Sequence, residues 1–292
     1  MIKVAAIIPT YKRNDQLPRA IDSVLKQTYK NIVAVVIDDN DENDEFSNGV
    51  KRIVSNYSNS NRVIYCRQPN HINGASARNY GVSITDAEYI AFLDDDDEWM
   101  PDKIEKQLSF LSLNKDYKGC SCLYNVIEND KIIRSCKPYE DNDLQLKVFL
   151  RKVAICTPTF ICEKQAFVEF GGFDVSLERH QDLQLFIDFL EKNKIHVINE
   201  YLVNVYSDSK INRPNTKKLI NAKKKLFEST SNAYLKYDKK TKRRIRNVHN
   251  FEIVFVALRN KNIFVALRYL LKIGFSFSAY KDLFERIRER KR

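Results

Sequence analysis

The sequence predicts an α/β protein, with a mostly parallel sheet followed by an antiparallel annex and a helical C-terminal region. Over residues 1–113, short apolar segments rich in β-branched residues alternate four times with helical segments, the pattern of parallel βαβ units. Over 114–210 this alternation stops, and over 211–292 apolar residues recur at helical spacing. We therefore expect one domain over 1–210, composed of the halves 1–113 and 114–210, and a helical region over 211–292.

The parallel half is predicted to contain four strands, of which 89–93 is expected to be buried on both faces. They are almost entirely apolar, as is typical inside a parallel sheet, and lie at 2–8, 32–37, 63–66 and 89–93. Helices are expected at 16–26, 50–57, 73–81 and 101–113, with Asn14 or Asp15 capping the first and Pro101 opening the last. Small residues in 73–81 allow close approach of the backbone to the sheet or to a ligand.

The remaining elements are expected to be less regular. In 114–210 we expect a hairpin of 120–128 and 131–136, a helix at 143–151, a strand at 157–162, a turn at 171–174, a helix at 183–192 and a strand at 195–205. The C-terminal region is expected to form helices at 215–237, 241–260, 263–273 and 278–290, with basic clusters beside apolar faces.

Four consecutive aspartates, Asp94 to Asp97, directly follow the predicted strand 89–93. A run of like charges is usually a solvated surface, since neighbouring carboxylates raise each other's pKa. Here the run is fixed between a buried strand and a helix start, at the strand end where open α/β sheets bind their ligands. Carboxylate oxygens gathered there suit Mg²⁺ or Mn²⁺, which one or two carboxylates commonly hold together with substrate phosphates.

A second acidic segment, Asp38 to Asp41 with Asn40 inside it, follows the predicted strand 32–37. Two acidic strand ends on one parallel sheet suggest a nucleotide site, where one end serves a metal and diphosphate and the other a base or ribose. Tyr11 could stack on a base, and Arg78 could pair with phosphate or orient a carboxylate. No Gly-x-x-x-x-Gly-Lys loop is present and no Gly-x-Gly-x-x-Gly follows the first strand, which argues against P-loop and dinucleotide folds.

Charge is distributed unevenly along the chain. Residues 1–209 carry 25 Lys and Arg against 32 Asp and Glu, a net charge of −7, whereas 210–292 carry 24 against 6, a net charge of +18. The C-terminal region is therefore expected to meet an anionic surface. The six cysteines lack metal-finger spacing and are expected to be buried thiols. Because we find no secretory signal and no apolar run of about 20 residues, we expect a cytoplasmic protein.

Five segments, in order, resemble glycosyltransferase family two, the inverting nucleotide-sugar transferases with a GT-A type, Rossmann-like fold. They are Pro9–Arg13, Ala20–Tyr29, Val36–Asn40, Ala77–Gly81 and Phe92–Trp99. Each segment alone is a weak signal, but their common order over residues 2 to about 110 is specific. The resemblance thins to scattered positions as far as about residue 205, and the region after 210 carries none.

The resemblance implies a donor pocket built from residues of the first half. Pro9 and Tyr11 would line the pocket for the base, and Asp39 would accept the N–H of uracil. Arg78 would lie near the diphosphate.

The resemblance also makes Asp94, Asp95 and Asp96 the Asp-x-Asp motif of the family. Asp95 would lie near the ribose, and Asp96 would contact the metal, Mn²⁺ or Mg²⁺. Asp97 and Glu98 are expected to be structural.

The catalytic base of the family is usually the Asp of a Glu-Asp pair that opens a helix in the second half. Asp182 occupies the matching place and is the candidate base, although Gln181 stands where Glu is common. The competing interpretation is that Asp182 only caps or starts the helix, where the dipole favours a carboxylate. His180 is the nearest rival base, but we expect it to be a surface histidine. His71, His196 and His249 lie in no motif.

The resemblance implies metal-dependent transfer of a sugar from a nucleotide sugar, most commonly of UDP, to a hydroxyl of a glycan or lipid-linked saccharide. We expect a hexosyl- or N-acetylhexosaminyl-transferase of bacterial surface-polysaccharide synthesis. The first alternative is a sugar transferase that acts on polyprenyl phosphate, since such enzymes share the first half. A nucleic-acid-binding protein is a remote alternative, and we expect no nucleic-acid partner because the aromatic residues of the tail are not interleaved with its lysines.

Two interpretations of the region 211–292 stay open. Basic clusters beside amphipathic helices suit anionic lipid headgroups, which would make the protein peripheral on the inner face of the cell membrane. The alternative is a helical bundle that packs its apolar faces on the catalytic body or on a second subunit, as in a homo-oligomer. The two interpretations can coexist.

Overall fold

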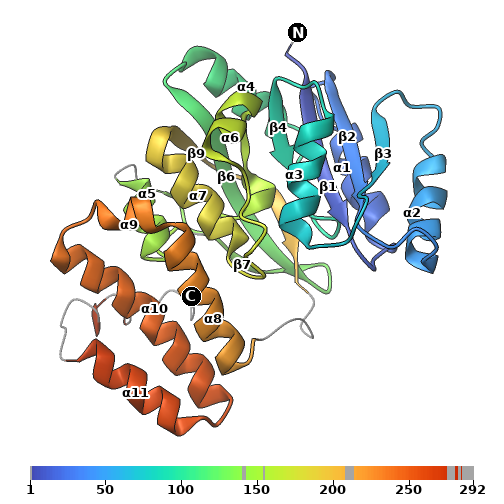
Figure 1. Cartoon of the computed structure of the whole chain (residues 1–292). Helices are drawn as coiled ribbons and strands as arrows, with labels where there is room; N and C mark the ends of the chain where they lie inside the picture. Colours follow the sequence, from blue (N-terminus) through green and yellow to red (C-terminus); the bar gives the residue numbers. More distant parts are fainter. Residues whose placement is uncertain are drawn as a thin grey trace. The chain divides into compact units, whose positions relative to one another are not determined.

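Figure 1 shows the protein as a computed structural model, in which residues 2–139, 143–153, 155–207, 214–274, 280, 281 and 284 are described. The chain divides into two compact units. The first comprises Met1–Asp141, Ala154–Val175 and Lys192–Ser209, and the second comprises Asn142–Val153, Ser176–Glu191 and Lys210–Arg292. Two stretches of the predicted 114–210 half, 142–153 and 176–191, therefore group with the C-terminal helices.

One sheet forms the centre of the first unit. Its strand order is β3-β2-β1-β4-β8-β6-β9-β5, and β7 pairs with β6 outside this path. The four parallel strands predicted from the sequence are β1 (Val4–Thr10), β2 (Ile32–Asp38), β3 (Val63–Arg67) and β4 (Tyr89–Phe92). They pair in parallel as β3-β2-β1-β4, which confirms the parallel half. The β1 strand continues through Pro9 to Thr10, two residues beyond the predicted end.

The strands of the predicted annex extend the same sheet, and they are β6 (Tyr117–Glu128), β7 (Lys131–Ser135), β8 (Ile161–Glu163) and β9 (Lys194–Tyr206). A further short strand, β5 (Glu98–Trp99), precedes the annex and was not predicted from the sequence. β8 pairs antiparallel with β4 and β6, and the β6–β7 and β5–β9 pairs are also antiparallel, whereas β6 and β9 are parallel. The predicted strand at 157–162 is wrong at its start, where Thr157–Thr159 form a 3₁₀ turn around Pro158, a residue that cannot donate to a strand ladder.

Three helices connect the parallel strands, namely α1 (Leu17–Leu25), α2 (Glu45–Ser55) and α3 (Gly74–Ile84). The helix α4 (Lys103–Leu113) leads from β5 to β6, and α6 (Lys164–Phe170), which the sequence did not predict, follows β8. α2 begins five residues before the predicted start because the Asp44 side chain accepts a hydrogen bond from Phe46 N at 2.8 Å and caps the helix. Neither Asn14 nor Asp15 caps α1, which begins after Gln16.

The small residues of α3 allow close packing on the sheet. A Cβ atom at Gly81 would lie 2.5 Å from the Ile7 side chain and 3.0 Å from that of Ile37, so a larger residue would push the helix away from β1 and β2. Asn73 caps this helix by accepting a hydrogen bond from Ser76 N at 3.1 Å. Close packing fixes the start of α3, and with it Arg78, against the sheet.

The second unit is helical in its described part. Its helices are α5 (Leu144–Phe149), α7 (Gln181–Lys192), α8 (Thr216–Ser229), α9 (Ser231–Leu235), α10 (Lys239–Arg259) and α11 (Ile263–Ile273). The predicted helix 215–237 breaks at Thr230, whose hydroxyl donates to Leu226 O at 2.8 Å. The predicted helix 278–290 lies outside the described residues, except for 280, 281 and 284.

Among the described residues, none of the helices combines the length and the apolar character that a membrane span requires.

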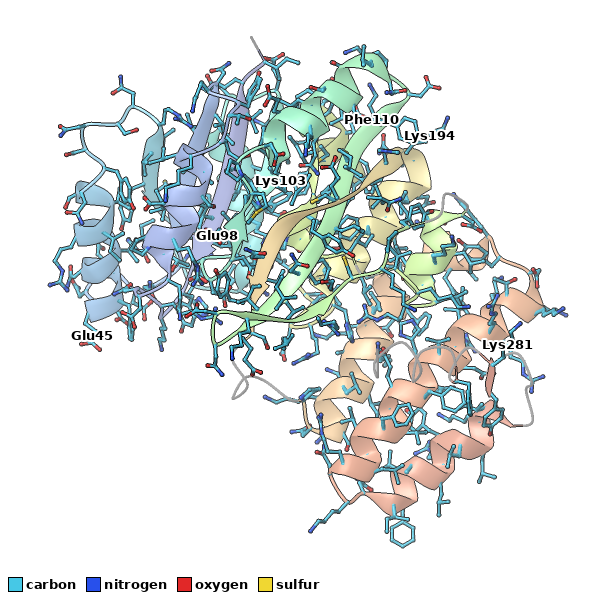
Figure 2. The ribbon with its side chains drawn as sticks, turned by 180° about the vertical axis from the view of Figure 1, so that it is seen from behind. Glu45, Glu98, Lys103, Phe110, Lys194 and Lys281 are labelled. Atoms are coloured by element: carbon cyan, nitrogen blue, oxygen red, sulfur yellow. The ribbon has the colours of Figure 1, made fainter. Side chains whose placement is uncertain are left out.

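Lys103 is fully buried in the first unit, at the start of α4 (Figure 2). Its ammonium group donates to Gln107 Oε1 at 2.8 Å and lies 4.1 Å from the centroid of the Trp99 ring. The buried thiols of Cys120 and Cys122, two of the six free cysteines, are close enough to affect its charge. Burial lowers the pKa of Lys103 to about 8, because these neutral partners replace only part of the hydration that the ammonium loses.

We predict that replacing Lys103 by Met removes a pH dependence of stability. The pKa of Lys103 is lowered from 10.5 to about 8 in the folded state. The contribution of Lys103 to the unfolding free energy is therefore fully present above pH 10.5, where the side chain is neutral in both states, and is lost as the pH falls through 8. Relative to Lys103→Met, the wild type should lose about 3 kcal/mol of unfolding free energy over this range. Urea unfolding of both proteins between pH 7 and pH 10 measures it, and a difference that does not change with pH would contradict it.

Candidate active site

The carboxyl ends of β1, β2 and β4 lie side by side at one edge of the sheet. Thr10 pairs with Asp38 in the parallel register, and the Asp39 backbone N–H donates to Thr10 O at 3.0 Å. On the other side of β1, Leu93 N donates to Ile7 O at 3.0 Å, which brings the end of β4 beside the same strand. The two acidic segments predicted from the sequence therefore meet around Thr10.

Arginine side chains pair with the acidic residues that follow β4. Arg13 forms ion pairs with Asp96 and, at 3.5 Å, with Asp95. Arg78, from α3, forms an ion pair with Asp94. Asp95 and Asp96 thus converge on one guanidinium group, whereas Asp94 is paired separately.

Burial removes hydration from the carboxylates of this cluster, and the nearby arginines do not fully replace it. Burial raises the pKa of Asp95 to about 7, even though Thr10 Oγ1 donates to Asp95 Oδ2 at 2.7 Å. Burial, and then the negative charge of Asp94, raises the pKa of Asp96 and more strongly that of Asp97. The arginines therefore offset only part of the negative charge, and an added cation would be stabilised here.

The donor chemistry of the cluster fits a hard divalent cation. The Asp96 side chain is 24% exposed and can reach a ligand, whereas that of Asp95 is 9% exposed. In the part of the chain that the structure describes, no three His, Cys, Asp or Glu side chains converge as a complete metal site. An ion on Asp96 would therefore need substrate oxygens as further ligands, as Mg²⁺ commonly does.

Asp97 and Glu98 connect the acidic segment to β9, in agreement with the structural role expected for them. Asp97 Oδ1 accepts a hydrogen bond from Tyr206 N at 3.0 Å, and Glu98 Oε2 accepts one from the Tyr206 hydroxyl at 3.3 Å. Arg19 lies over the Tyr206 ring, 3.5 Å from its centroid, and donates to the backbone oxygen of Asp96. These contacts fix the backbone from which Asp95 and Asp96 project.

A second group of side chains surrounds Asp39, at the end of β2. Asp39 is buried, and it accepts from Gln68 Nε2 at 2.9 Å and lies 2.9 Å from His71 Nδ1. The His71 ring stacks on Tyr11, with a centroid distance of 3.9 Å and an interplanar angle of 7°. Burial raises the pKa of Asp39, and the His71 contact opposes the shift. A planar ring with an N–H group therefore already lies on Tyr11 and beside Asp39.

Other predicted positions have plain structural surroundings. Pro9 is half-buried in β1, opposite Ile37. Asp38 is fully buried and shapes the turn after β2, because it accepts hydrogen bonds from Asn40 at 2.7 Å and Ser47 at 2.7 Å. The Nε atom of Arg78 is buried without a hydrogen-bond partner among the described residues, so this guanidinium has a donor to spare.

Sequence reasoning missed several side chains of this edge. Thr10 and Arg13 lie inside the Pro9–Arg13 segment but were given no role, and Gln68 and His71 lie in the loop after β3. The signal that could have found the last two is their position, because β3 is the third parallel strand whose carboxyl end faces this edge.

Asp182 lies in the second unit, apart in the chain division from the predicted donor residues, which all belong to the first. It is half-buried in the first turn of α7, and its Oδ1 lies 2.8 Å from Leu183 N. The rival base His180 is not the surface histidine we expected, because its Nε2 atom is buried without a partner among the described residues. Burial, and then the positive charges of Lys223 and Arg151, lowers the pKa of His180 to about 2, which makes it a weak proton acceptor.

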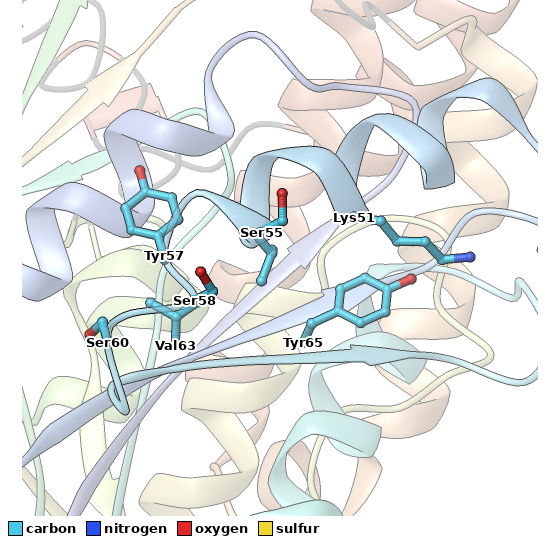
Figure 3. Close-up of a pocket in the computed structure, with 8 residues that line it drawn as sticks. Lys51, Ser55, Tyr57, Ser58, Ser60, Val63 and Tyr65 are labelled. Carbon is cyan, nitrogen blue, oxygen red and sulfur yellow. The ribbon is translucent and has the colours of Figure 1, made fainter.

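A separate hollow of about 430 Å³ lies between α2 and β3 (Figure 3). Lys51, Ser55, Tyr57 and Tyr65 are among its lining residues. The hydroxyls of the two tyrosines are already bonded to Asp22 and Asp38, at 2.8 and 2.9 Å. The hollow contains none of the predicted site residues, and the acidic edge described above remains the candidate site.

Comparison with known proteins relates most of the chain to transferases. The family model described as Glycosyl transferase family 2 matches residues 5–169, more than half of the chain. An uncharacterized glycosyltransferase of Rickettsia felis is 32% identical over 203 residues, which are 70% of this chain but only 33% of that protein, so the chain spans about a third of its length. UDP-Glc:alpha-D-GlcNAc-diphosphoundecaprenol beta-1,3-glucosyltransferase WfaP of Escherichia coli is 31% identical over 208 residues, which cover 70% of this chain and 76% of WfaP.

Solved structures share the fold at low sequence identity. TarS 1–349 of S. aureus in complex with UDP-GlcNAc superposes with a TM-score of 0.61 at 13% identity, over 94% of this chain and 93% of that chain. Mannosyltransferase PcManGT from Pyrobaculum calidifontis, in complex with GDP-Man and Mn²⁺, superposes with a TM-score of 0.60 at 13% identity, over 98% and 79% of the two chains. These likenesses confirm the predicted GT-A type fold.

We predict that Thr10→Val destabilises the first unit, because Asp95 loses the hydroxyl that donates to its buried carboxylate. The loss should be about 1–3 kcal/mol of unfolding free energy. It should be larger at pH 8 than at pH 6, because only the ionised form of Asp95, with its pKa of about 7, needs the donor. Chemical denaturation tests this, with Thr10→Ser, which keeps the hydroxyl, as the control. Equal stability of the Val and Ser variants at pH 8 would contradict it.

Proposed function

The chain belongs to glycosyl transferase family 2, and from this membership we propose that it transfers a sugar from a nucleotide sugar to a hydroxyl group of a glycan or lipid-linked saccharide. The observation that carries the proposal is the meeting of two acidic strand ends at Thr10. One end offers Asp39 beside an aromatic ring, and the other offers Asp94 to Asp96, with an excess of negative charge. A base and a metal–diphosphate are the two halves of a nucleotide that such ends would bind.

We propose UDP as the donor nucleotide, with its uracil between Pro9, Tyr11 and Asp39. The named substrate of WfaP, UDP-Glc, supports UDP, whereas GDP-Man in PcManGT shows that the fold also serves another nucleotide. The Asp39 carboxylate already lies beside a ring nitrogen, that of His71, and the N–H of a base could replace this contact. For the base to stack on the covered face of Tyr11, His71 has to leave that face.

The diphosphate is assigned to the other acidic strand end. Arg78 would bind a phosphate oxygen through its spare Nε–H, and Asp95 would lie near the ribose. Asp96 would hold Mn²⁺ or Mg²⁺ together with diphosphate oxygens, and such an ion would offset negative charge on the leaving group. Asp94, paired with Arg78, would orient that guanidinium.

We assign the base to Asp182. It would take the proton from the acceptor hydroxyl as that oxygen attacks the anomeric carbon, while the bond from this carbon to the diphosphate breaks, with inversion. Asp182 lies in the first turn of α7, at the helix start where the resemblance places the base. The low pKa of His180 argues against histidine as the base.

We propose the acceptor by analogy with WfaP, and the two candidate reactions differ in this acceptor. The name of WfaP, an enzyme that acts on a diphosphoundecaprenol-linked sugar, favours a lipid-linked saccharide and a role in surface-polysaccharide synthesis, with a hexose or N-acetylhexosamine transferred. The alternative is transfer to polyprenyl phosphate itself. Radiolabelled nucleotide sugars supplied with each acceptor distinguish them, after a donor-hydrolysis screen with and without Mn²⁺ has identified the sugar. No hydrolysis of any nucleotide sugar would reject the proposal.

Cytoplasmic location and homo-oligomer formation stay predictions. A donor made in the cytoplasm and a lipid-linked acceptor would meet at the inner face of the membrane, so we propose a peripheral protein there. The molar mass in solution, from light scattering, measures the oligomeric state.

We predict that UDP with Mn²⁺ changes the environment of His71, because base and imidazole compete for Tyr11 and Asp39. The chain has four histidines, so their ring signals can be separated by NMR and that of His71 assigned with His71→Gln. His196, which lies in β9 and stacks on Phe110 at a centroid distance of 3.8 Å, is the internal control. Saturating UDP that shifts neither signal, or both equally, would contradict the assigned base site.

We also predict that Asp182→Asn and Asp96→Ala each lower the rate of transfer by about 10²-fold or more, but for different reasons. Asp182→Asn should bind UDP with Mn²⁺ as tightly as the wild type, because only proton removal is lost. Asp96→Ala should lose the gain in UDP affinity that Mn²⁺ provides. Asp188→Asn, on the same helix α7, is the matched control and should keep activity. A fully active Asp182→Asn protein would reject the role of Asp182.

A further inference from the structure

The apolar residues of the C-terminal helices fall into two groups that the sequence did not distinguish. Phe251, Val254 and Ala257 of α10 are buried against Ala266 and Ile273 of α11. By contrast, three large apolar side chains of α11 are exposed. They are Phe264 at 88%, Leu267 at 53% and Leu271 at 82%, and we call them the α11 apolar face. Among the described residues, packing therefore accounts for one side of α11 and leaves the other exposed.

The α11 apolar face is one continuous side of the helix. Its members are spaced three and four residues apart, which places them above one another on a helical surface. Ile263, in the first turn, is also exposed. An isolated exposed leucine such as Leu113 is ordinary, but a helix that is apolar on both sides is usually covered on both. Burial of these side chains would therefore be favourable.

The stretch of sequence that contains this face carries charges of one sign only. Residues 253–281 contain no Asp or Glu, and they contain Arg259, Lys261, Arg268, Lys272 and Lys281. Arg268 and Lys272 lie on α11 itself and are exposed. Long basic side chains can extend to an anionic layer while the apolar residues between them enter a less polar one.

This charge pattern decides between the occupants of the face. In a two-fold dimer of this chain the same patch would meet itself, so the cations around it would repel across the interface. An anionic bilayer instead offers negative headgroups for the arginines and lysines and acyl chains for Phe264 and Leu271. Each basic residue near such a surface adds to the attraction. The charges thus favour lipid over a second copy.

We propose that the α11 apolar face is the part of the protein that enters the surface of an anionic phospholipid membrane, with its cations bound to the headgroups. The helix would lie in the plane of the membrane surface, as interfacial amphipathic helices do. Vesicle binding requires no transfer activity, so this inference stands or fails separately from the proposed reaction.

Flotation of the full chain with vesicles tests the proposal. The wild type should float with vesicles of phosphatidylglycerol and phosphatidylcholine, less in high salt than in low salt, and should not float with phosphatidylcholine alone. The double variant Phe264→Ser/Leu271→Ser should bind at least about tenfold more weakly, because it loses two inserted side chains. Arg268→Gln/Lys272→Gln should lose the preference for anionic vesicles.

The matched control is Leu113→Ser, in the first unit, where a leucine is 84% exposed outside the proposed surface. It should bind vesicles like the wild type, and circular dichroism should show that all variants are folded. Three results would overturn the proposal: no binding in low salt, equal binding of neutral vesicles, or undiminished binding of the Phe264→Ser/Leu271→Ser variant. A dimer that this variant fails to form, without vesicle binding by the wild type, would assign the face to a second copy instead.

Discussion

Mutual repulsion among the carboxylates at the end of β4 is the constraint around which the first unit is arranged. Asp94 is paired with Arg78 from α3, and Asp95 and Asp96 share Arg13 from the segment after β1. These arginines do not fully compensate for the hydration that the carboxylates lose, since burial still raises the pKa of Asp95 and Asp96. The cluster therefore keeps an affinity for further positive charge, which a divalent cation bound to a diphosphate would satisfy.

The parallel sheet explains why this cluster lies beside Asp39, where we propose that a base binds. β1 is paired with both β2 and β4, so their carboxyl ends meet across the width of one strand. Thr10, the last residue of β1, contacts the segments on both sides through Asp39 N and Asp95 Oδ2. A ligand that spans the edge would touch the base pocket at one end and the acidic cluster at the other, which is the geometry that a nucleoside diphosphate needs.

The pattern of apolar residues in the sequence predicted the elements whose structure depends on residues close to one another in the chain. The four parallel strands are almost wholly apolar, and their fully buried positions, such as Ile7, Val36 and Ile90, show why this signal was clear. The acidic candidate residues were predicted for the same reason, since their position after a buried strand is visible in the sequence. His71 was missed because a single histidine in a loop has no pattern, and only the folded chain shows that it lies on Tyr11. The grouping of 142–153 and 176–191 with the C-terminal helices depends on long-range packing, which periodicity does not contain.

The most direct test of the central claim is the calorimetric measurement of UDP binding with Mn²⁺ and with a chelator in its place. If uncompensated carboxylates at the end of β4 gather a cation around the donor diphosphate, UDP should bind at least about tenfold more tightly with Mn²⁺, a gain of about 1.4 kcal/mol. Equal affinity in the two conditions would contradict the account.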